Sequence, residues 1–276
     1  MKKLILAVLT FLTIGIVAGC DPLIEEGPAP TAVNVGDFQS TINQVIVNGK
    51  KSNRFVCDTK SAVSVKWTDS VINYTGSHAV ITMFATGNQS ITVTGRNQDG
   101  STFTKDFQVT VEEKSFPVPP EYEYLCGSNQ KTWTWQEEKC FGNGGNTGTG
   151  PEWWVLNPAD VTEQCKGKKL PADGLGATMT FTLKGLKIKK TTADQQVSAG
   201  TIKLDLESNK ANNAERGLGA LRLSGANIPC GYDFNGNLQP WPEYNIISLT
   251  PDKMVLAARE FNNKDNFWYF VFVPKK

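Results

Sequence analysis

Residues 244–273 read YNIISLTPDKMVLAAREFNNKDNFWYFVFV, and this stretch decides the fold of the second half of the chain. Three apolar runs are separated by two short turns, Thr250-Pro251-Asp252 and residues 262–265. Apolar runs of this length between turn-forming residues predict neighbouring antiparallel strands. Further strand-like runs precede them at residues 178–183, 201–206 and 219–223. The sequence therefore predicts an all-β domain over residues 122–276, an antiparallel sandwich or barrel of jelly-roll or lipocalin-like kind.

Residues 31–114 hold a second set of short strands. Within them, residues 90–112 read SITVTGRNQDGSTFTKDFQVTVE, two alternating runs around the turn Asp99-Gly100. An Asp-Gly pair between alternating runs is a strong hairpin signal, and repeated short runs of this kind predict a β-sandwich. The two strands resemble the last two strands of immunoglobulin-like domains of the PKD type, and Trp67, close to Asp69, stands where that family has a core tryptophan. The resemblance implies a spacer or binding platform, and it transfers no functional residue.

Between these regions, residues 115–121 read SFPVPPE, a proline-rich segment. Proline favours extended backbone, so we expect a semi-rigid linker between two domains. Helix signals are weak, apart from a short turn expected near residues 158–164. With 276 residues the chain is long enough for two domains of common size.

The start of the chain has the composition of an export signal. Met1-Lys2-Lys3 precedes an apolar run that ends in Val17-Ala18-Gly19-Cys20. A cationic start, a short apolar run and small residues at the exit predict a secretory signal peptide over residues 1–19. The exit resembles the bacterial lipobox, which implies that Cys20 is lipidated and anchors the protein at the outer membrane or cell surface. Residues 20–30 are expected to be a flexible tether.

Charge and histidine content narrow the functional classes. Lys and Arg number 28 against 27 Asp and Glu, which gives a net charge of +1, and no basic block stands out. A nucleic-acid-binding protein normally has a basic stripe, so we expect no nucleic-acid partner. The single histidine, His78, is expected in a solvated loop and leaves little material for a Ser-His pair. We expect no cofactor and no metal site, although loop carboxylates and carbonyls would suffice for calcium.

Five of the six cysteines lie beyond Cys20, and none forms a Cys-x-x-Cys pair. An exported protein can form disulfides. Cys140 and Cys165 flank a glycine-rich segment and are the pair that we expect to be bridged, with buried reduced thiols as the equal alternative. The remaining three are Cys57, Cys126 and Cys230.

Two tryptophan-bearing segments of the second region do not alternate. Residues 143–154 read NGGNTGTGPEWW, a glycine-rich and therefore flexible loop that ends in Trp153 and Trp154, and residues 238–244 read LQPWPEY around Trp241. Loops on a rigid β scaffold are the usual location of binding residues. A wide apolar ring in a solvated loop exposes a large hydrophobic face, which indicates a binding role. We therefore expect these three indole rings to be exposed.

The other tryptophans of this region are expected in the core. Trp133 and Trp135 are two residues apart, so both point to one face of a strand. Trp268 lies in the strongly apolar run at residues 266–273.

A sugar ring is the ligand that exposed indoles predict, because its C–H face is apolar and its rim carries hydroxyl groups. At about 25 cal/mol per Å² of buried apolar surface, one stacked ring contributes on the order of 1 kcal/mol, so two or three rings give weak binding. Carboxylates and amides nearby would bind the hydroxyl groups. The candidates are Glu152, Asn157, Asp160, Gln239 and Glu243.

The order of lipobox, PKD-like domain and tryptophan-rich β domain resembles the accessory lipoproteins of glycan-uptake systems in Bacteroidetes. The last domain begins with KTW at residues 131–133 and ends with FWYFVF at residues 267–272. The resemblance implies a non-catalytic surface lipoprotein that binds polysaccharide or oligosaccharide and works with a glycan transporter complex. One alternative is a glycoside hydrolase or lyase of unfamiliar pattern, although Glu137-Glu138 and the other acidic residues form no recognised catalytic signature. The other is a structural or assembly protein at the cell surface.

Overall fold

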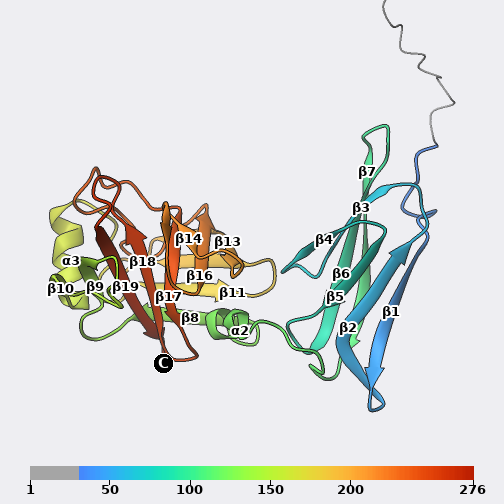
Figure 1. The fold of residues 1–276 in the computed structure, drawn as a ribbon, viewed down its shortest axis with the longest axis horizontal. Coiled ribbons are helices and arrows are strands. Elements are labelled where there is room, and N and C mark those ends of the chain that lie inside the picture. Colours follow the sequence, from blue (N-terminus) through green and yellow to red (C-terminus); the bar gives the residue numbers. More distant parts are fainter. Residues whose placement is uncertain (1–30) are drawn as a thin grey trace, which may run out of the picture.

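The computed structural model of the chain describes residues 31–276, which form two β domains joined by a short segment (Figure 1). The predicted signal peptide at residues 1–19, the predicted lipidation site Cys20 and the tether at residues 20–30 lie outside the described residues. Across residues 31–276, no helix has both the length and the apolar character that a membrane-spanning segment needs.

The first domain is a sandwich of two antiparallel sheets. Its strands are β1 (Ser40–Val47), β2 (Lys50–Thr59), β3 (Ser64–Thr68), β4 (Asn73–Thr75), β5 (His78–Thr82), β6 (Gly87–Arg96) and β7 (Thr102–Val111). One sheet has the order β1-β2-β5 and the other β4-β3-β6-β7. Side chains of both sheets meet around Trp67, which is fully buried and donates from Nε1 to the carbonyl of Gly76 at 3.0 Å. The prediction that Trp67 is a core residue is confirmed.

Turn residues set the hairpins of this domain. Asn48 and Gly49 have φ angles of 51° and 77° and join β1 to β2, a left-handed pair that Asn-Gly adopts readily. The Asp99-Gly100 signal also marks a hairpin, because β6 and β7 pair along their full lengths on either side of it. Alternation along β6 then directs Ile91 and Val93 into the core, where neither is exposed.

The second domain is built around a closed antiparallel barrel. Its strands are β8 (Gln130–Trp135), β9 (Phe141–Gly145), β10 (Trp154–Leu156), β11 (Thr178–Thr182), β12 (Lys187–Thr191), β13 (Val197–Asp205), β14 (Lys210–Ala211), β15 (Ala214–Glu215), β16 (Gly219–Ser224), β17 (Glu243–Leu249), β18 (Met254–Arg259) and β19 (Asn266–Pro274). The barrel strands follow one another in the order β8-β11-β12-β13-β16-β17-β18-β19, and β19 pairs with β8 to close the ring. This is an up-and-down barrel, so the jelly-roll alternative, which needs Greek-key crossovers, is wrong.

Aromatic side chains fill the interior of the barrel. Trp133 and Trp135 are 0% and 4% exposed, and Trp135 stacks on Phe272 with ring centroids 4.4 Å apart. Trp268 is 1% exposed and stacks on Phe141 with centroids 5.3 Å apart. The prediction that these three tryptophans lie in the core is confirmed. Because the interior is occupied by side chains, a ligand has to meet this domain at its rim or on its outer surface.

Two short elements extend the barrel beyond its ring. The first half of β19 pairs with β9, and β9 carries β10 on its other side. Helix α3 (Pro158–Gly167) follows β10, which confirms the helical turn expected near residues 158–164.

Helix α2 (Pro120–Cys126) was not expected, because Pro120 lies inside the proline-rich linker. Proline is tolerated in a first helical turn, since its missing N–H has no partner there.

The segment before α2 is held against the first domain. Asn53 of β2 is fully buried, and its side chain accepts from the backbone N–H of Phe116 and donates to the carbonyl of Phe116, both at 2.9 Å. The guanidinium of Arg54 lies 3.8 Å from the centre of the Phe116 ring. The linker is therefore bound along β2 rather than free.

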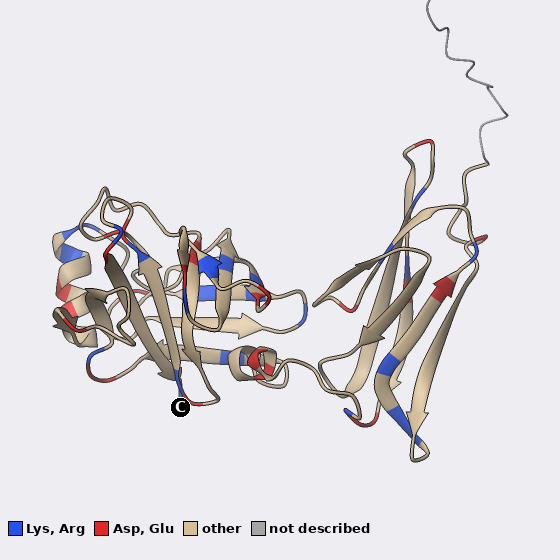
Figure 2. Cartoon of the chain, in the orientation of Figure 1, with Lys and Arg blue, Asp and Glu red and all other residues tan. Residues whose placement is uncertain are grey.

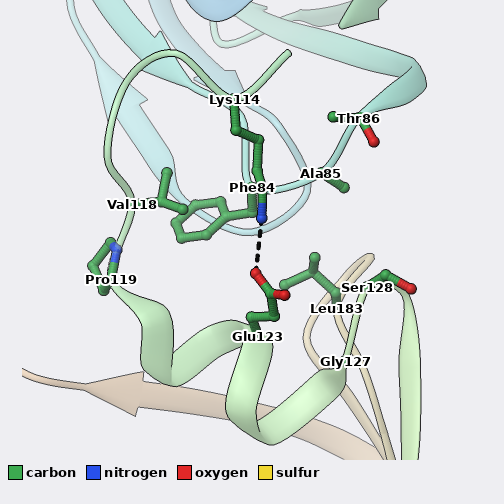
Figure 3. Close-up of a pocket in the computed structure, with 10 residues that line it drawn as sticks. All are labelled: Phe84, Ala85, Thr86, Lys114, Val118, Pro119, Glu123, Gly127, Ser128 and Leu183. Carbon is green, nitrogen blue, oxygen red and sulfur yellow. Dashed lines mark hydrogen bonds and ion pairs between the residues drawn. The ribbon is translucent and has the colours of Figure 1, made fainter. Parts of the chain in front are cut away.

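The two domains also touch directly. Phe84 of the first domain packs on Tyr122 of α2 with ring centroids 4.5 Å apart. Beside this pair, a hollow of about 310 Å³ is crossed by the ion pair of Lys114 and Glu123, whose Nζ and Oε2 atoms are 2.7 Å apart (Figure 3). The backbone N–H of Gly185 in the barrel donates to the carbonyl of Ser70 at 2.9 Å.

Basic and acidic residues are mixed along the chain in both domains (Figure 2). One grouping of Lys and Arg lies on β12, β13 and β16, and Lys203 and Arg222 within it approach the Asp205 carboxylate at 3.7 and 3.5 Å. The charge of this grouping is therefore partly neutralised.

Candidate functional site

The exposed indole rings lie on the Trp hairpin, which we define as residues 141–156: β9, a glycine-rich turn and β10. The register places Asn143 of β9 between Trp154 of β10 and Trp268 of β19, so the three side chains share one face of the sheet. Trp154 meets Trp268 edge to face, with ring centroids 5.9 Å apart. Trp154 is 37% exposed and therefore forms the outer margin of an aromatic row that continues into the core.

Trp153 lies beside this row and is 63% exposed. Asn143 and Gly145 are two residues apart on β9 and so face the same way. A Cβ atom added to Gly145 would lie 3.3 Å from Cζ2 of Trp153, which places the Trp153 ring over this same face. The two neighbouring indoles therefore present exposed surface on one side of the hairpin, because Trp153 precedes β10 and does not follow its alternation.

Two glycines allow this arrangement. Gly142 has a φ of 153°, and a side chain there would overlap the backbone carbonyl of Trp154 on the paired strand. A glycine at 142 is thus required for β10 to approach β9. Gly145 leaves the space into which the Trp153 ring extends.

The turn of the hairpin is fixed by side chains from the outer wall of the barrel. The hydroxyl of Tyr269 donates to the carbonyl of Gly145 at 2.5 Å, and Nη1 of Arg216 donates to the same hydroxyl oxygen at 2.8 Å. Arg216 also donates to the carbonyl of Gly148 and lies 4.7 Å from the centre of the Phe267 ring. The prediction of a flexible loop at residues 143–154 is wrong, since both ends of the segment are paired strand and the turn between them is anchored.

Trp241 is buried, and the prediction that it is exposed is wrong. Its exposed fraction is 1%, and its Nε1 donates to the carbonyl of Arg259 at 3.1 Å. Phe261 covers the ring at a centroid distance of 5.9 Å and an interplanar angle of 29°, and Phe270 packs against it from the core at 6.0 Å. The prolines on either side of Trp241 are exposed in its place.

Two of the polar candidates cap a helix. Asn157 and Asp160 form a capping box at the start of α3, in which the Asn157 side chain accepts from the N–H of Asp160 and the Asp160 carboxylate accepts from the N–H of Asn157. Asn157 Oδ1 also accepts from the backbone N–H of Lys139 at 2.9 Å. These two residues are thus engaged in structure, and the prediction that Asn157 binds a ligand is not supported.

Glu243 is engaged in the same way. Its carboxylate forms an ion pair with Arg222 of β16 and accepts from the backbone N–H of Asn212 at 2.5 Å. It therefore holds two segments of the barrel together and is not a free acceptor, which corrects its assignment as a ligand-binding residue. Glu152 and Gln239 are both exposed, and Glu152 lies on the Trp hairpin directly before Trp153.

A second concave surface, the Tyr232 hollow, was not expected from the sequence. Its volume is about 380 Å³, and Tyr232 and the loop around Trp241 form part of its wall. Burial raises the pKa of Tyr232 to about 12. The hydroxyl of Ser198 in this wall is buried and has no hydrogen-bond partner within residues 31–276. The lining residues are Lys190, Ser198, Leu223, Gly225, Ala226, Asn227, Tyr232, Pro240, Trp241 and Pro242.

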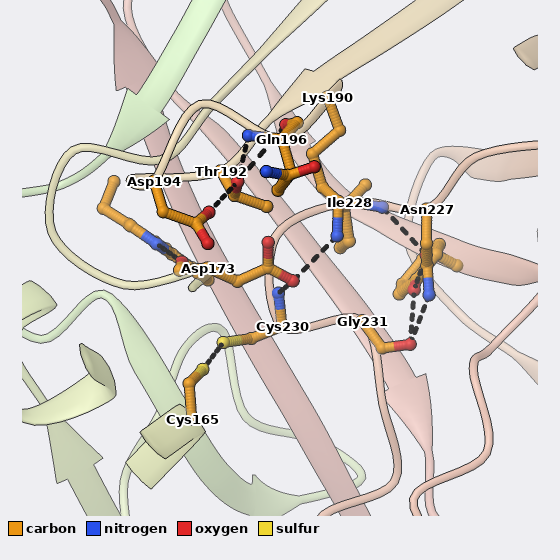
Figure 4. A network of polar contacts seen from close by, with 12 residues as sticks. Cys165, Asp173, Lys190, Thr192, Asp194, Gln196, Asn227, Ile228, Cys230 and Gly231 are labelled. Carbon is orange, nitrogen blue, oxygen red and sulfur yellow. Dashed lines mark hydrogen bonds and ion pairs between the residues drawn. The ribbon is translucent and has the colours of Figure 1, made fainter. Parts of the chain in front are cut away.

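A buried ion pair lies at the base of the Tyr232 hollow. Nζ of Lys190 is 2.8 Å from Oδ2 of Asp173, and the two side chains are 6% and 0% exposed (Figure 4). Burial raises the pKa of Asp173, and the positive charge of Lys190 acts in the opposite direction. The alternation along β12 could have indicated that Lys190 faces inward, because Ile188 two residues before it is buried. No comparable local pattern marks Tyr232, which lies in the irregular segment between β16 and β17.

The expected Cys140–Cys165 disulfide is wrong. Cys140 Sγ contacts the carbonyl of Leu156 at 3.4 Å, whereas Cys165 Sγ lies 3.0 Å from Cys230 Sγ. All five described cysteines are buried, and none is bonded to another. Burial raises the pKa of the Cys57, Cys126 and Cys140 thiols to about 12.

No three His, Cys, Asp or Glu side chains of residues 31–276 are placed together so that they could hold a metal ion. His78 is exposed as expected but begins β5 instead of lying in a loop, and its Nδ1 is 2.7 Å from Oδ1 of Asp58.

The chain matches no known protein-family model, and no curated protein matches it in sequence. The fold and the site together define its class: a two-domain, all-β protein with a filled barrel that presents tryptophan rings on an anchored hairpin at its rim.

Proposed function

We propose that the protein is a non-catalytic, lipid-anchored lipoprotein of the bacterial outer membrane or cell surface that binds polysaccharide or oligosaccharide. The observation that carries the proposal is the Trp hairpin, where Trp153 is 63% and Trp154 37% exposed on one face. Soluble proteins seldom expose adjacent wide apolar rings on an anchored segment without a binding partner. A sugar face fits these rings. Glu152 directs its side chain to the other face of β9, toward Tyr269, so the indole rings carry the contact.

The anchored turn supports binding in a second way. Because Tyr269 and Arg216 already hold the carbonyls of Gly145 and Gly148, little conformational freedom is lost when a ligand stacks on the rings. One stacked ring contributes on the order of 1 kcal/mol, so the affinity for a single sugar unit is weak. A polymer with many units raises the effective concentration at the same site.

The lipid anchor and the first domain would together set the position of the barrel relative to the membrane. Cys20 would carry the lipid, and the first domain, which resembles PKD-type immunoglobulin-like domains, would hold the barrel away from the membrane. The binding of the linker along β2 and the contact of Phe84 with Tyr122 favour a fixed spacer. A glycan transporter complex is the partner that the resemblance implies.

Affinity gel electrophoresis tests the proposal. The full chain is run through native gels that contain a panel of plant, microbial and host polysaccharides. At least one polysaccharide should retard it, and Trp153→Ala should weaken that retardation about tenfold, which corresponds to about 1.4 kcal/mol. The matched control is Leu175→Ala, because Leu175 is also 63% exposed and lies outside the hairpin. Tyr232→Ala tests the Tyr232 hollow as the alternative binding site and should leave the retardation unchanged. Equal retardation of Trp153→Ala and wild type would contradict the assignment of the site.

One observation favours a second candidate, a surface protein that binds another protein. β10 pairs only with β9 among the described strands, and its residues Trp154 and Val155 are exposed. An exposed sheet edge can accept a strand from a partner chain. This candidate gains support if no polysaccharide retards the protein while Val155→Lys, which places a charge on the exposed edge strand, abolishes co-purification of a partner from the cell envelope.

A further inference from the structure

Two cysteines far apart in the sequence meet inside the second domain. Cys165 lies in the last turns of α3, and Cys230 lies in the loop between β16 and β17. Their Sγ atoms are 3.0 Å apart, and the residues are 1% and 0% exposed (Figure 4). None of the other described cysteines has a second sulfur as a partner.

The surroundings hold Cys230 in place for this contact. Its backbone N–H donates to Oδ2 of Asp173 at 3.1 Å, and Asp173 is itself paired with Lys190. Cys230 has a φ of 53°, a left-handed conformation that is strained for a residue with a side chain and that glycine adopts freely. A glycine at position 230 would remove this strain, yet position 230 holds a cysteine and the glycine is the next residue, Gly231. This placement is explained if the sulfur is needed there.

We propose that Cys165 and Cys230 form a disulfide in the exported protein. The bond would tie α3, which follows the Trp hairpin, to the loop that forms the wall of the Tyr232 hollow. It requires an oxidising compartment, which the export predicted for the chain supplies. It does not depend on whether the protein binds glycans.

Bond formation is a two-electron oxidation, and the oxidant is a dithiol–disulfide exchange protein or a small-molecule disulfide in its oxidised form. The Cys165 thiolate attacks one sulfur of the oxidant, whose other sulfur leaves as a thiolate. The Cys230 sulfur, on losing its proton, then attacks the mixed disulfide at Cys165 and releases the second sulfur of the oxidant. Two protein thiols become one disulfide, and the oxidant disulfide becomes two thiols that take up the two protons.

Once α3 has packed, the two thiols differ in their electrostatics. The hydrogen bond with Cys230 lowers the pKa of the Cys165 thiol, whereas burial raises the pKa of the Cys230 thiol well above its ordinary value. In the folded protein, Cys165 is thus the more readily ionised thiol of the pair. Both sulfurs are buried in the folded protein, so the exchange takes place while α3 is still open to the oxidant during folding.

Peptide mapping of the full chain tests the proposal. The protein is purified from the cell envelope without reductant, denatured in the presence of an alkylating reagent and digested. One cross-linked peptide pair that contains Cys165 and Cys230 should appear, lighter by two hydrogen atoms than its reduced parts, and Cys57, Cys126 and Cys140 should be alkylated. Alkylation of both Cys165 and Cys230, or a link of either one to another cysteine, overturns the proposal.

Thermal unfolding gives an independent readout. The bond would close a loop across a separation of 65 residues, so reduction should lower the Tm of the second domain by roughly 10 °C. Cys165→Ala should start from the lower Tm and show no response to reductant. The matched control is Cys126→Ala, which removes a buried thiol without a sulfur partner and should keep the full response. A wild-type Tm that reductant does not change overturns the proposal.

Discussion

The Trp hairpin and the loop around Trp241 both place a tryptophan against the aromatic core of β19, yet their rings meet solvent very differently. Trp154 contacts Trp268 at 5.9 Å, and Trp241 contacts Phe270 at 6.0 Å. Above Trp241 lies Phe261, and the ring is 1% exposed. Within residues 31–276 no aromatic ring packs on Trp153, which extends over Gly145 and is 63% exposed.

The difference shows that a covering residue, and not the local composition, decides whether a loop tryptophan is a core residue or a binding residue. Trp241 therefore contributes to stability, and Trp153 is available to a ligand. Substitutions that affect one property and not the other test this division.

The largest expected effect is on stability at Trp241. Trp241→Ala should lower the free energy of unfolding of the second domain by about 4 kcal/mol, because it leaves a cavity between Phe261 and Phe270. Trp153→Ala should change the same quantity by no more than about 0.5 kcal/mol. Urea unfolding followed by far-ultraviolet circular dichroism measures both. Similar losses for the two variants would remove the distinction between the rings.

The next effect concerns the shape of the hairpin. Gly142→Ala should destabilise the second domain by about 2–3 kcal/mol, because the added methyl group overlaps the Trp154 carbonyl and forces β10 away from β9. Gly150→Ala is the control, since no atom lies within 4 Å of a Cβ at that position in the same hairpin. A Gly142→Ala variant as stable as Gly150→Ala would show that β10 does not lie where the structure places it.

Much of the fold could be predicted from the sequence, because strands and turns are encoded locally. The alternation in residues 90–112 and the apolar runs in residues 244–273 correspond to β6, β7 and β17–β19. The site was less predictable for a physical reason. Trp241 is buried by Phe261, twenty positions along the chain, and no local pattern reports that contact.

Other parts of the site depended on equally distant partners. Cys165 meets Cys230 across 65 residues, so spacing favoured the wrong partner, Cys140. By contrast, Asn157 and Asp160 are three residues apart directly before and within a helix, which is the pattern of a capping box. That signal was available in the sequence, and it would have removed Asn157 from the ligand-binding set.

A smaller effect is expected on glycan binding when the Trp153 ring is displaced slightly. Gly145→Ala places a methyl group 3.3 Å from Cζ2 of Trp153, so the indole must move by a few tenths of an ångström. Stability should stay within about 0.5 kcal/mol of wild type, and retardation by a polysaccharide that binds the protein should weaken about twofold. Retardation that is unchanged in Gly145→Ala but lost in Tyr232→Ala would move the site to the Tyr232 hollow.

The smallest expected effect is on the pH dependence of the unfolding free energy of the first domain. Burial raises the pKa of Asp69 in the first domain above its ordinary 3.8, and Oδ2 of this side chain has no partner within residues 31–276. A raised folded-state pKa means that the folded state holds the proton more tightly, so this stability is complete at low pH and lost as the pH rises through the folded-state pKa. Asp69→Asn should therefore flatten the decline in the unfolding free energy of the first domain above pH 3.8. Equal slopes in both proteins would contradict this reading of Asp69.

The most direct measurement uses ¹⁹F nuclear magnetic resonance of the full chain labelled with 5-fluorotryptophan, with resonances assigned by single Trp→Phe variants. On titration with a soluble glycan that retards the protein, the Trp153 resonance should shift and the Trp241 resonance should stay fixed. A shift of Trp241 without one of Trp153, or no shift of either ring with any retarding glycan, would contradict the proposal that the Trp hairpin is the binding site.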